Sequence, residues 1–136
     1  MVALVSSVTA GYAATPLGKD LIGIWETKGS EFRGEALIKG HALYLDSDGV
    51  GAMVGAPDYS TCIGIRVVVT SWDSTKNVLK IDLTDNGKTI ESGSLNYDPT
   101  KKTIVSPSEP KEIYRRRAEK MSAGIRESIG LESKSK

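Results

Sequence analysis

Short extended runs separated by tight-turn sequences recur through the second half of this chain. Between residues 78 and 84, Leu79, Ile81 and Leu83 share one face and polar residues occupy the other. The Asn-Gly pair at residues 86–87 follows closely, and this dipeptide is typical of a two-residue hairpin turn. Because a short turn joins antiparallel strands whereas parallel strands need a long crossover, the spacing predicts an antiparallel meander.

The other extended runs are recognised by β-branched and aromatic content between glycine-rich or polar breaks. Strands are expected at residues 21–28, 36–38, 41–45, 52–54, 62–72, 78–84, 89–97, 103–106 and 113–116. Lys39-Gly40 is expected to interrupt the second run, and the glycine-rich residues 49–59 are expected to form a loop around one short strand.

Side-chain alternation assigns the residues of these strands to two faces. Leu43 and Leu45 share one face, with Ala42 and Tyr44 on the other. In the long run at 62–72 the same rule gives two sets, namely Ile63, Ile65, Val67 and Val69 against Arg66, Val68, Thr70 and Trp72.

About eight short strands in an open sheet would leave two unpaired edges, and a closed barrel removes both. The predicted fold is therefore all-β, an antiparallel up-and-down β-barrel of about eight short strands, with a two-sheet sandwich as the alternative. Residues 118–131 change to a four-residue period at Met121, Ile125 and Ile129, which predicts a short C-terminal helix leaning on the sheet.

Residues 1–14 resemble the end of a secretory signal peptide, with apolar or small residues followed by Ala-Gly-Tyr-Ala-Ala. No basic residue precedes Lys19, so an apolar N-terminal strand is the alternative. The run is too short to span a bilayer, and no cysteine follows it for a lipid anchor. We expect a periplasmic or secreted protein without a stable membrane anchor, divided into a leader at 1–14, a barrel at 15–117, and a helix and tail at 118–136.

Charge and residue counts exclude several kinds of function. Lys and Arg total 18 against 17 acidic residues, so the formal net charge of +1 predicts no strong electrostatic attraction to nucleic acid or to an anionic membrane. One cysteine, Cys62, and one histidine, His41, exclude an intrachain disulfide and the usual zinc motifs. No cofactor is expected. The basic run at 115–117 lacks the interleaved aromatic residues of a nucleic-acid surface.

Three further motifs are weak. Asp46-x-Asp48-Gly49 is similar to part of a calcium loop, but its glycine stands too early and no glutamate follows at the required distance. The glycines of residues 49–55 do not have dinucleotide-binding spacing. The sequence contains no Gly-x-Ser-x-Gly motif whose serine His41 could activate. Cys62 is expected to be a small buried apolar residue. We therefore do not expect an enzyme.

Gly23-Ile24-Trp25 is similar to the Gly-x-Trp signature of the lipocalins and their calycin relatives. The order of later features is similar too: an apolar strand ending in an Asp-Gly turn at 43–49, a strand ending in Trp72, and Ile113-Tyr114-Arg115 near the close of the meander. The resemblance implies that an arginine of residues 115–117 stacks over Trp25. Gly23, Trp25 and Arg115 form the expected structural signature, with Arg116 and Arg117 as alternatives for the arginine.

The resemblance also implies a barrel that binds an apolar or amphipathic small molecule. The residues expected to line its cavity or mouth are Leu43, Leu45, Met53, Tyr59, Ile65, Val67, Leu79 and Ile81. The alternative is a solid barrel that binds or inhibits another exported protein through a loop or the basic C-terminal region. A continuous interior void favours the first function, and a filled interior favours the second.

Overall fold

Strands that follow one another in the chain pair side by side, from the second strand to the ninth. The computed structural model describes residues 14–57, 63–107 and 111–129. Within these residues the strands are β1 (Gly23–Thr27), β2 (Glu31–Arg33), β3 (Ala36–Leu45), β4 (Val50–Ala56), β5 (Ile63–Asp73), β6 (Val78–Asp85), β7 (Lys88–Asp98), β8 (Thr103–Ser106) and β9 (Glu112–Ala118).

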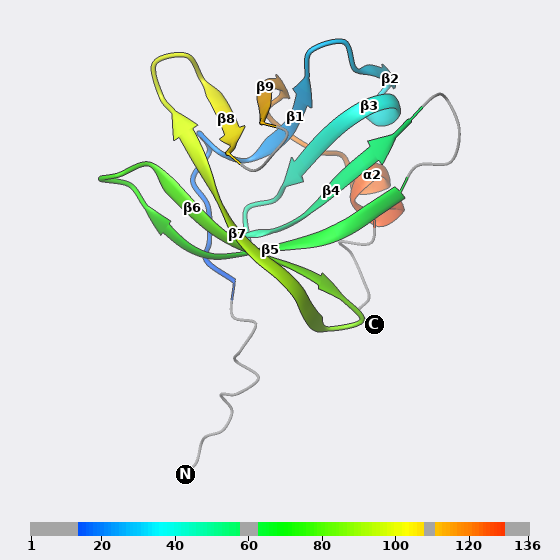
Figure 1. Ribbon diagram of the computed structural model, residues 1–136. Coiled ribbons are helices and arrows are strands. Elements are labelled where there is room, and N and C mark those ends of the chain that lie inside the picture. The colour runs from blue at the N-terminus through cyan, green and yellow to red at the C-terminus, as the bar shows by residue number, and fades with distance from the viewer. Residues whose placement is uncertain (1–13, 58–62, 108–110, 130–136) are drawn as a thin grey trace.

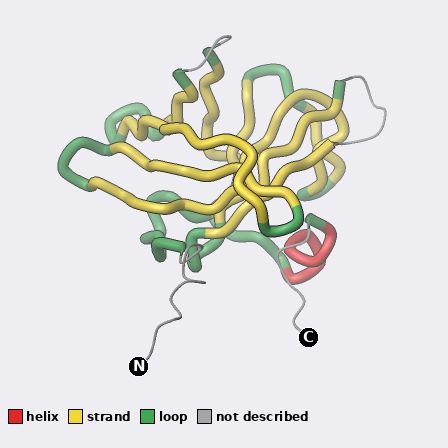
Figure 2. The backbone as a smooth tube through the Cα atoms, turned by 60° about the horizontal axis from the view of Figure 1, so that its bottom comes forward, coloured by secondary structure: helices red, strands yellow, loops and turns green. Residues whose placement is uncertain are grey.

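The sheet closes on itself through β1. This strand pairs antiparallel with β9 on one side and with β3 on the other, so eight strands form a ring. The ninth, β2, lies outside the ring and pairs only with the first half of β3. Figures 1 and 2 show the strands curving round into a barrel. The predicted up-and-down barrel is confirmed, and the sandwich alternative is wrong.

The turn between β6 and β7 forms where the Asn-Gly pair predicts it. Asn86 has φ of 52° and Gly87 has φ of 80°, the left-handed conformations that a tight hairpin turn requires at both central positions. Asp85 and Lys88 face each other across this turn. Local sequence is therefore sufficient to place this hairpin.

One face of the strands in the ring fills the interior at the end of the barrel where β1 begins. Trp25 lies opposite Leu43, which in turn lies opposite Met53, so these side chains point the same way. The buried residues that pack together in this core are Leu17, Leu21, Trp25, Leu43, Leu45, Val67, Val69, Leu79, Ile81, Leu95, Ile104 and Tyr114.

A bulge in β5 corrects the predicted face of Trp72. Val69 lies opposite Ile81, whereas Trp72 lies opposite Leu79, so one residue between them is unpaired. Since an extra residue reverses the alternation, Trp72 turns inward and packs against the core. Strict period-two counting placed it on the outside.

Strands β3 and β4 are longer than the sequence predicts. The expected break at Lys39-Gly40 is absent, because Gly40 keeps the strand paired while taking φ of 101°. The loop expected from residue 49 is instead strand β4 as far as Ala56. A Cβ at Gly51 would lie 1.8 Å from the carbonyl oxygen of Tyr44. Glycine is required there by the close approach of β3, rather than by loop flexibility.

The predicted C-terminal helix is shorter than its periodic pattern. Helix α2 spans Ala123–Ser128, and Ala118 belongs to β9. Ser122 begins the helix, since its side chain accepts a hydrogen bond from the backbone N–H of Ile125. The helix lies outside the ring of strands (Figure 2). Ile125 is buried there, and Met121 and Ile129 pack against the same cluster, so the apolar stripe does face the sheet.

Candidate functional site

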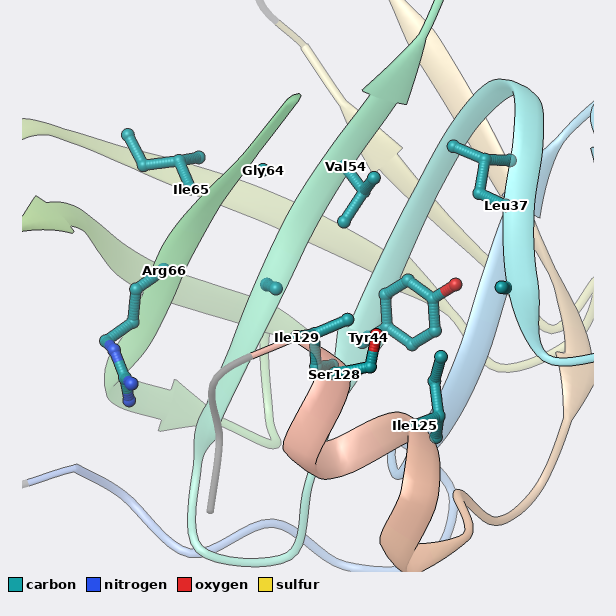
Figure 3. Close-up of a pocket in the computed structure, with 11 residues that line it drawn as sticks. Leu37, Tyr44, Val54, Gly64, Ile65, Arg66, Ile125, Ser128 and Ile129 are labelled. Atoms are coloured by element: carbon teal, nitrogen blue, oxygen red, sulfur yellow. The ribbon is translucent and has the colours of Figure 1, made fainter. Parts of the chain in front are cut away.

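An apolar groove lies on the outside of the barrel, between α2 and the outer faces of β3, β4 and β5 (Figure 3). Its volume is about 420 Å³. We call it the helix groove, and it is lined by Ala36, Leu37, Tyr44, Ala52, Val54, Gly64, Ile65, Arg66, Ile125, Ser128 and Ile129.

Polar contacts just before α2 and within it hold this helical wall of the groove in place. Before the helix, the backbone N–H and the hydroxyl of Ser122 both donate to the carboxylate of Glu35. Within the helix, Nε of Arg126 lies 2.8 Å from Oδ2 of Asp46. A six-residue helix is too short to be stable alone. These contacts, together with burial of Ile125, explain why it forms here.

Small residues in the floor of the groove create its volume. Ala52 on β4 and Gly64 on β5 stand where larger side chains would fill the space. Tyr44 forms part of the floor, and its hydroxyl donates a hydrogen bond to the backbone carbonyl of Glu35 at 2.7 Å. Val54 and Ile125 face the groove from opposite walls (Figure 3). The groove therefore offers mainly apolar surface, with Arg66 and Ser128 as polar groups in its lining.

Four of the predicted cavity residues are packed in the barrel core. Leu43, Leu45, Val67 and Leu79 each have an exposed fraction of 0%. A side chain with no accessible surface has no water-sized space beside it, whether that space opens to solvent or is enclosed. Ile81 is buried in the same core. These five residues therefore fill the interior around Trp25.

The other predicted cavity residues that the structure describes are less deeply buried. Met53 on β4 and Ile65 on β5 are half-buried and face each other in adjacent strands. Ile65 also lines the helix groove, and no other predicted cavity residue that the structure describes does so. Tyr59 lies outside the described residues. The sequence thus grouped side chains that the structure divides between five buried positions and two half-buried ones.

The predicted tryptophan–arginine pair forms with Arg116. The indole N–H of Trp25 donates to the carbonyl of Leu21 at 3.0 Å, and Cζ of Arg116 lies 5.4 Å from the ring centroid. Arg116 also donates to the carbonyls of Lys19 and Ile22, so it ties the N-terminal segment over the end of the barrel. Arg115 is exposed on the other face of β9 and does not fill this role.

The motifs named above take the following places among the residues that the structure describes. Nδ1 of His41 lies 3.5 Å from Oε2 of Glu112. Asp46 forms the ion pair with Arg126, so it contributes to fold stability. No group of three potential metal ligands occurs in residues 14–57, 63–107 and 111–129. Cys62 lies outside these ranges.

Tyr114 is expected to make the free energy of unfolding depend on pH. Burial, followed by its hydrogen bond to Glu112 at 2.9 Å, raises the pKa of its phenol above the usual 10. The folded state therefore keeps its proton at a pH where the unfolded state has lost it. The contribution of Tyr114 to the free energy of unfolding is complete below about pH 10. Above that pH it falls by about 1.4 kcal/mol per pH unit.

Urea unfolding at alkaline pH would measure this slope, with Tyr114→Phe as the comparison. The variant should be less stable at neutral pH, because Glu112 loses a hydrogen-bond donor. Its stability should fall less steeply above pH 10. Equal slopes for the two proteins would contradict the assignment.

Sequence reasoning missed the helix groove although two signals for it were present. Tyr44 and Ala42 are apolar on the face opposite Leu43 and Leu45. A strand that is apolar on both faces is usually covered on both. The stripe at Met121, Ile125 and Ile129 supplied the matching cover. The space between these two surfaces follows from small residues on β4 and β5, and no local pattern predicts it.

Comparisons of this chain with protein-family models, with characterised proteins and with solved structures found no significant match. No helix among the described residues has the length and apolar character needed to cross a membrane.

Proposed function

We propose that this protein is an exported, non-catalytic, lipocalin-like barrel that binds an apolar or amphipathic small molecule, and that the ligand occupies the helix groove. The observation that carries this proposal is the groove itself, with a volume of about 420 Å³ and walls formed by Leu37, Val54 and Ile125. Pockets for small molecules commonly enclose about 300–1,000 Å³ and are mostly apolar with a few polar groups.

The packing of the interior favours the outer groove over the barrel centre. A ligand placed beside Leu43, Val67 or Leu79 would have to displace side chains that have no exposed surface. Opening such space in a close-packed core costs several kcal/mol. In the helix groove the ligand would enter space that already exists beside Ala52 and Gly64.

The lipocalin-like assignment is supported by the closed barrel and by the indole–guanidinium stacking at its end. The periplasmic or secreted location is proposed from the sequence of residues 1–14, of which residues 1–13 lie outside the described structure. The groove offers burial to a ligand, rather than a nucleophile and base positioned for a reaction.

Two glycine substitutions test where a ligand binds. Gly64 is exposed in the groove, and a Cβ there would make ordinary contact with Val54 at 3.4 Å, so Gly64→Leu should fold while filling the groove. Gly93 on β7 lies opposite Ile81 on the interior face, and a Cβ there would meet nothing within 4 Å. Gly93→Leu is therefore the matched control, which adds the same side chain to the inside of the barrel.

Fluorescence titration with the apolar dye N-phenyl-1-naphthylamine provides the measurement. We expect saturable binding of one dye per chain, weakened at least about tenfold by Gly64→Leu and little changed by Gly93→Leu. Loss of binding in Gly93→Leu alone would instead place the ligand inside the barrel. Absence of saturable binding to the unmodified protein would count against the small-molecule function.

The filled interior around Trp25 favours a second candidate function, a protein-interaction module on another exported protein. Such a role needs no cavity and uses the surface of the barrel. Co-purification of one stoichiometric protein partner from the native source, together with no dye binding, would support it over the first.

A further inference from the structure

The first half of β7 has a strand neighbour on one side only. Residues from Lys88 to Asn96 pair with β6, whereas β8 pairs only with Asn96, Tyr97 and Asp98. Within the described parts of the chain, no strand pairs with the far side of residues 88–95. In Figure 1 this part of β7 extends past the end of β8. Residues 88–94 are all exposed, so the edge is open to solvent.

We propose that this edge pairs antiparallel with the same edge of a second copy of the chain, which makes the protein a homodimer. An unpaired strand edge presents backbone N–H and C=O groups that another strand can satisfy. The dimer would extend the sheet across a two-fold axis. This inference is independent of ligand binding in the helix groove, because β7 contributes no residue to that groove.

A bulge in β7 places two opposite charges on one face of this edge. Glu91 lies opposite Leu83, while Lys88 lies opposite Asp85. Leu83 and Asp85 are two residues apart on β6 and share a face, so Lys88 and Glu91 share a face as well. The extra residue that makes this possible is Ile90.

The charge pattern is complementary to itself, which is why a second copy fits better than an unrelated peptide. When two such edges run antiparallel with Thr89 opposite Ile90, each Lys88 lies opposite Glu91 of the second copy. Opposite charges at facing positions stabilise a strand pair, and like charges destabilise it. Ile90, 59% exposed in the single chain, then lies beside the two-fold axis. Its burial there would remove exposed apolar surface.

Sedimentation equilibrium across the micromolar range tests the dimer with two charge reversals. The unmodified protein should dimerise. Lys88→Glu places glutamates opposite each other, and Glu91→Lys places lysines opposite each other, so each variant alone should dimerise at least about tenfold more weakly. An equimolar mixture of the two should recover dimerisation, because each facing pair is then one lysine and one glutamate.

Lys76→Glu is the control, since it makes the same charge change in an exposed turn at the other end of the barrel. It should dimerise like the unmodified protein. Far-UV circular dichroism would establish that all variants are folded. A monomeric unmodified protein would overturn the proposal. So would a dimer that is insensitive to Lys88→Glu, or a mixture of the two variants that associates no better than either alone.

Discussion

Replacing Trp25 with alanine is expected to lower the free energy of unfolding by about 3–5 kcal/mol, which is much of the stability of a typical domain. The indole is fully buried, and its N–H donates to the carbonyl of Leu21 at 3.0 Å. Its ring also meets Tyr97 edge-on, with 6.3 Å between centroids, and lies under the Arg116 guanidinium. The substitution would leave a large cavity and a half-buried arginine without its aromatic surface.

Urea unfolding followed by far-UV circular dichroism would measure this loss. Trp72→Ala is the matched control. The ring of Trp72 also packs edge-on against Tyr97, with 6.2 Å between centroids, but Trp72 is only half-buried. We expect it to cost roughly half as much. If the two variants were equally stable, Trp25 would not be the residue on which packing of this end depends.

Gly23→Ala is expected to destabilise the protein by about 3 kcal/mol, from backbone strain together with a steric clash. Gly23 has φ of 137°, in a region that residues with a side chain rarely adopt. A Cβ at this position would lie 2.1 Å from the backbone oxygen of Ala118 on β9. Because that oxygen belongs to a paired strand, relief requires β1 and β9 to separate where the barrel closes.

The control for this prediction is Gly93→Ala, a glycine in a strand with nothing within 4 Å of a Cβ and no positive φ. Its unfolding free energy should change by less than about 1 kcal/mol. The same urea measurement compares the two variants. A small effect of Gly23→Ala, similar to that of Gly93→Ala, would show that β1 and β9 are not held together as closely as the structure indicates.

Much of the fold could be predicted because its signals are local. The positive φ angles of Asn86 and Gly87 follow from residue type, and the alternation of Leu79, Ile81 and Leu83 follows from strand geometry. Closure into a barrel follows from strand number and the cost of open edges. The predictions that failed, for Trp72 and β4, depended on a bulge and on a close approach between strands. The bulge and the close approach are both defined by pairing with an adjacent strand, so neither can be predicted from one run of residues.

The candidate site was less predictable than the fold. Leu43, Val67 and Leu79 were assigned to an inward face, but the alternation does not tell whether that interior is hollow or filled. Their zero exposed fraction comes from residues far along the chain that pack around Trp25. The helix groove combines residues of β3, β4 and β5 with α2, which lies about sixty residues after β5 begins.

The sequence by itself determined the antiparallel strands, the Asn-Gly hairpin, and the shared face of Leu79, Ile81 and Leu83. These depend on period-two alternation and on the backbone preferences of single residues. Only the tertiary structure decided that Arg116 covers the indole, because the register between β1 and β9 places Trp25 opposite Arg116 and turns Arg115 to the other face. It also decided that the helix groove lies beneath α2, because the volume of that groove depends on how side chains from distant parts of the chain pack together.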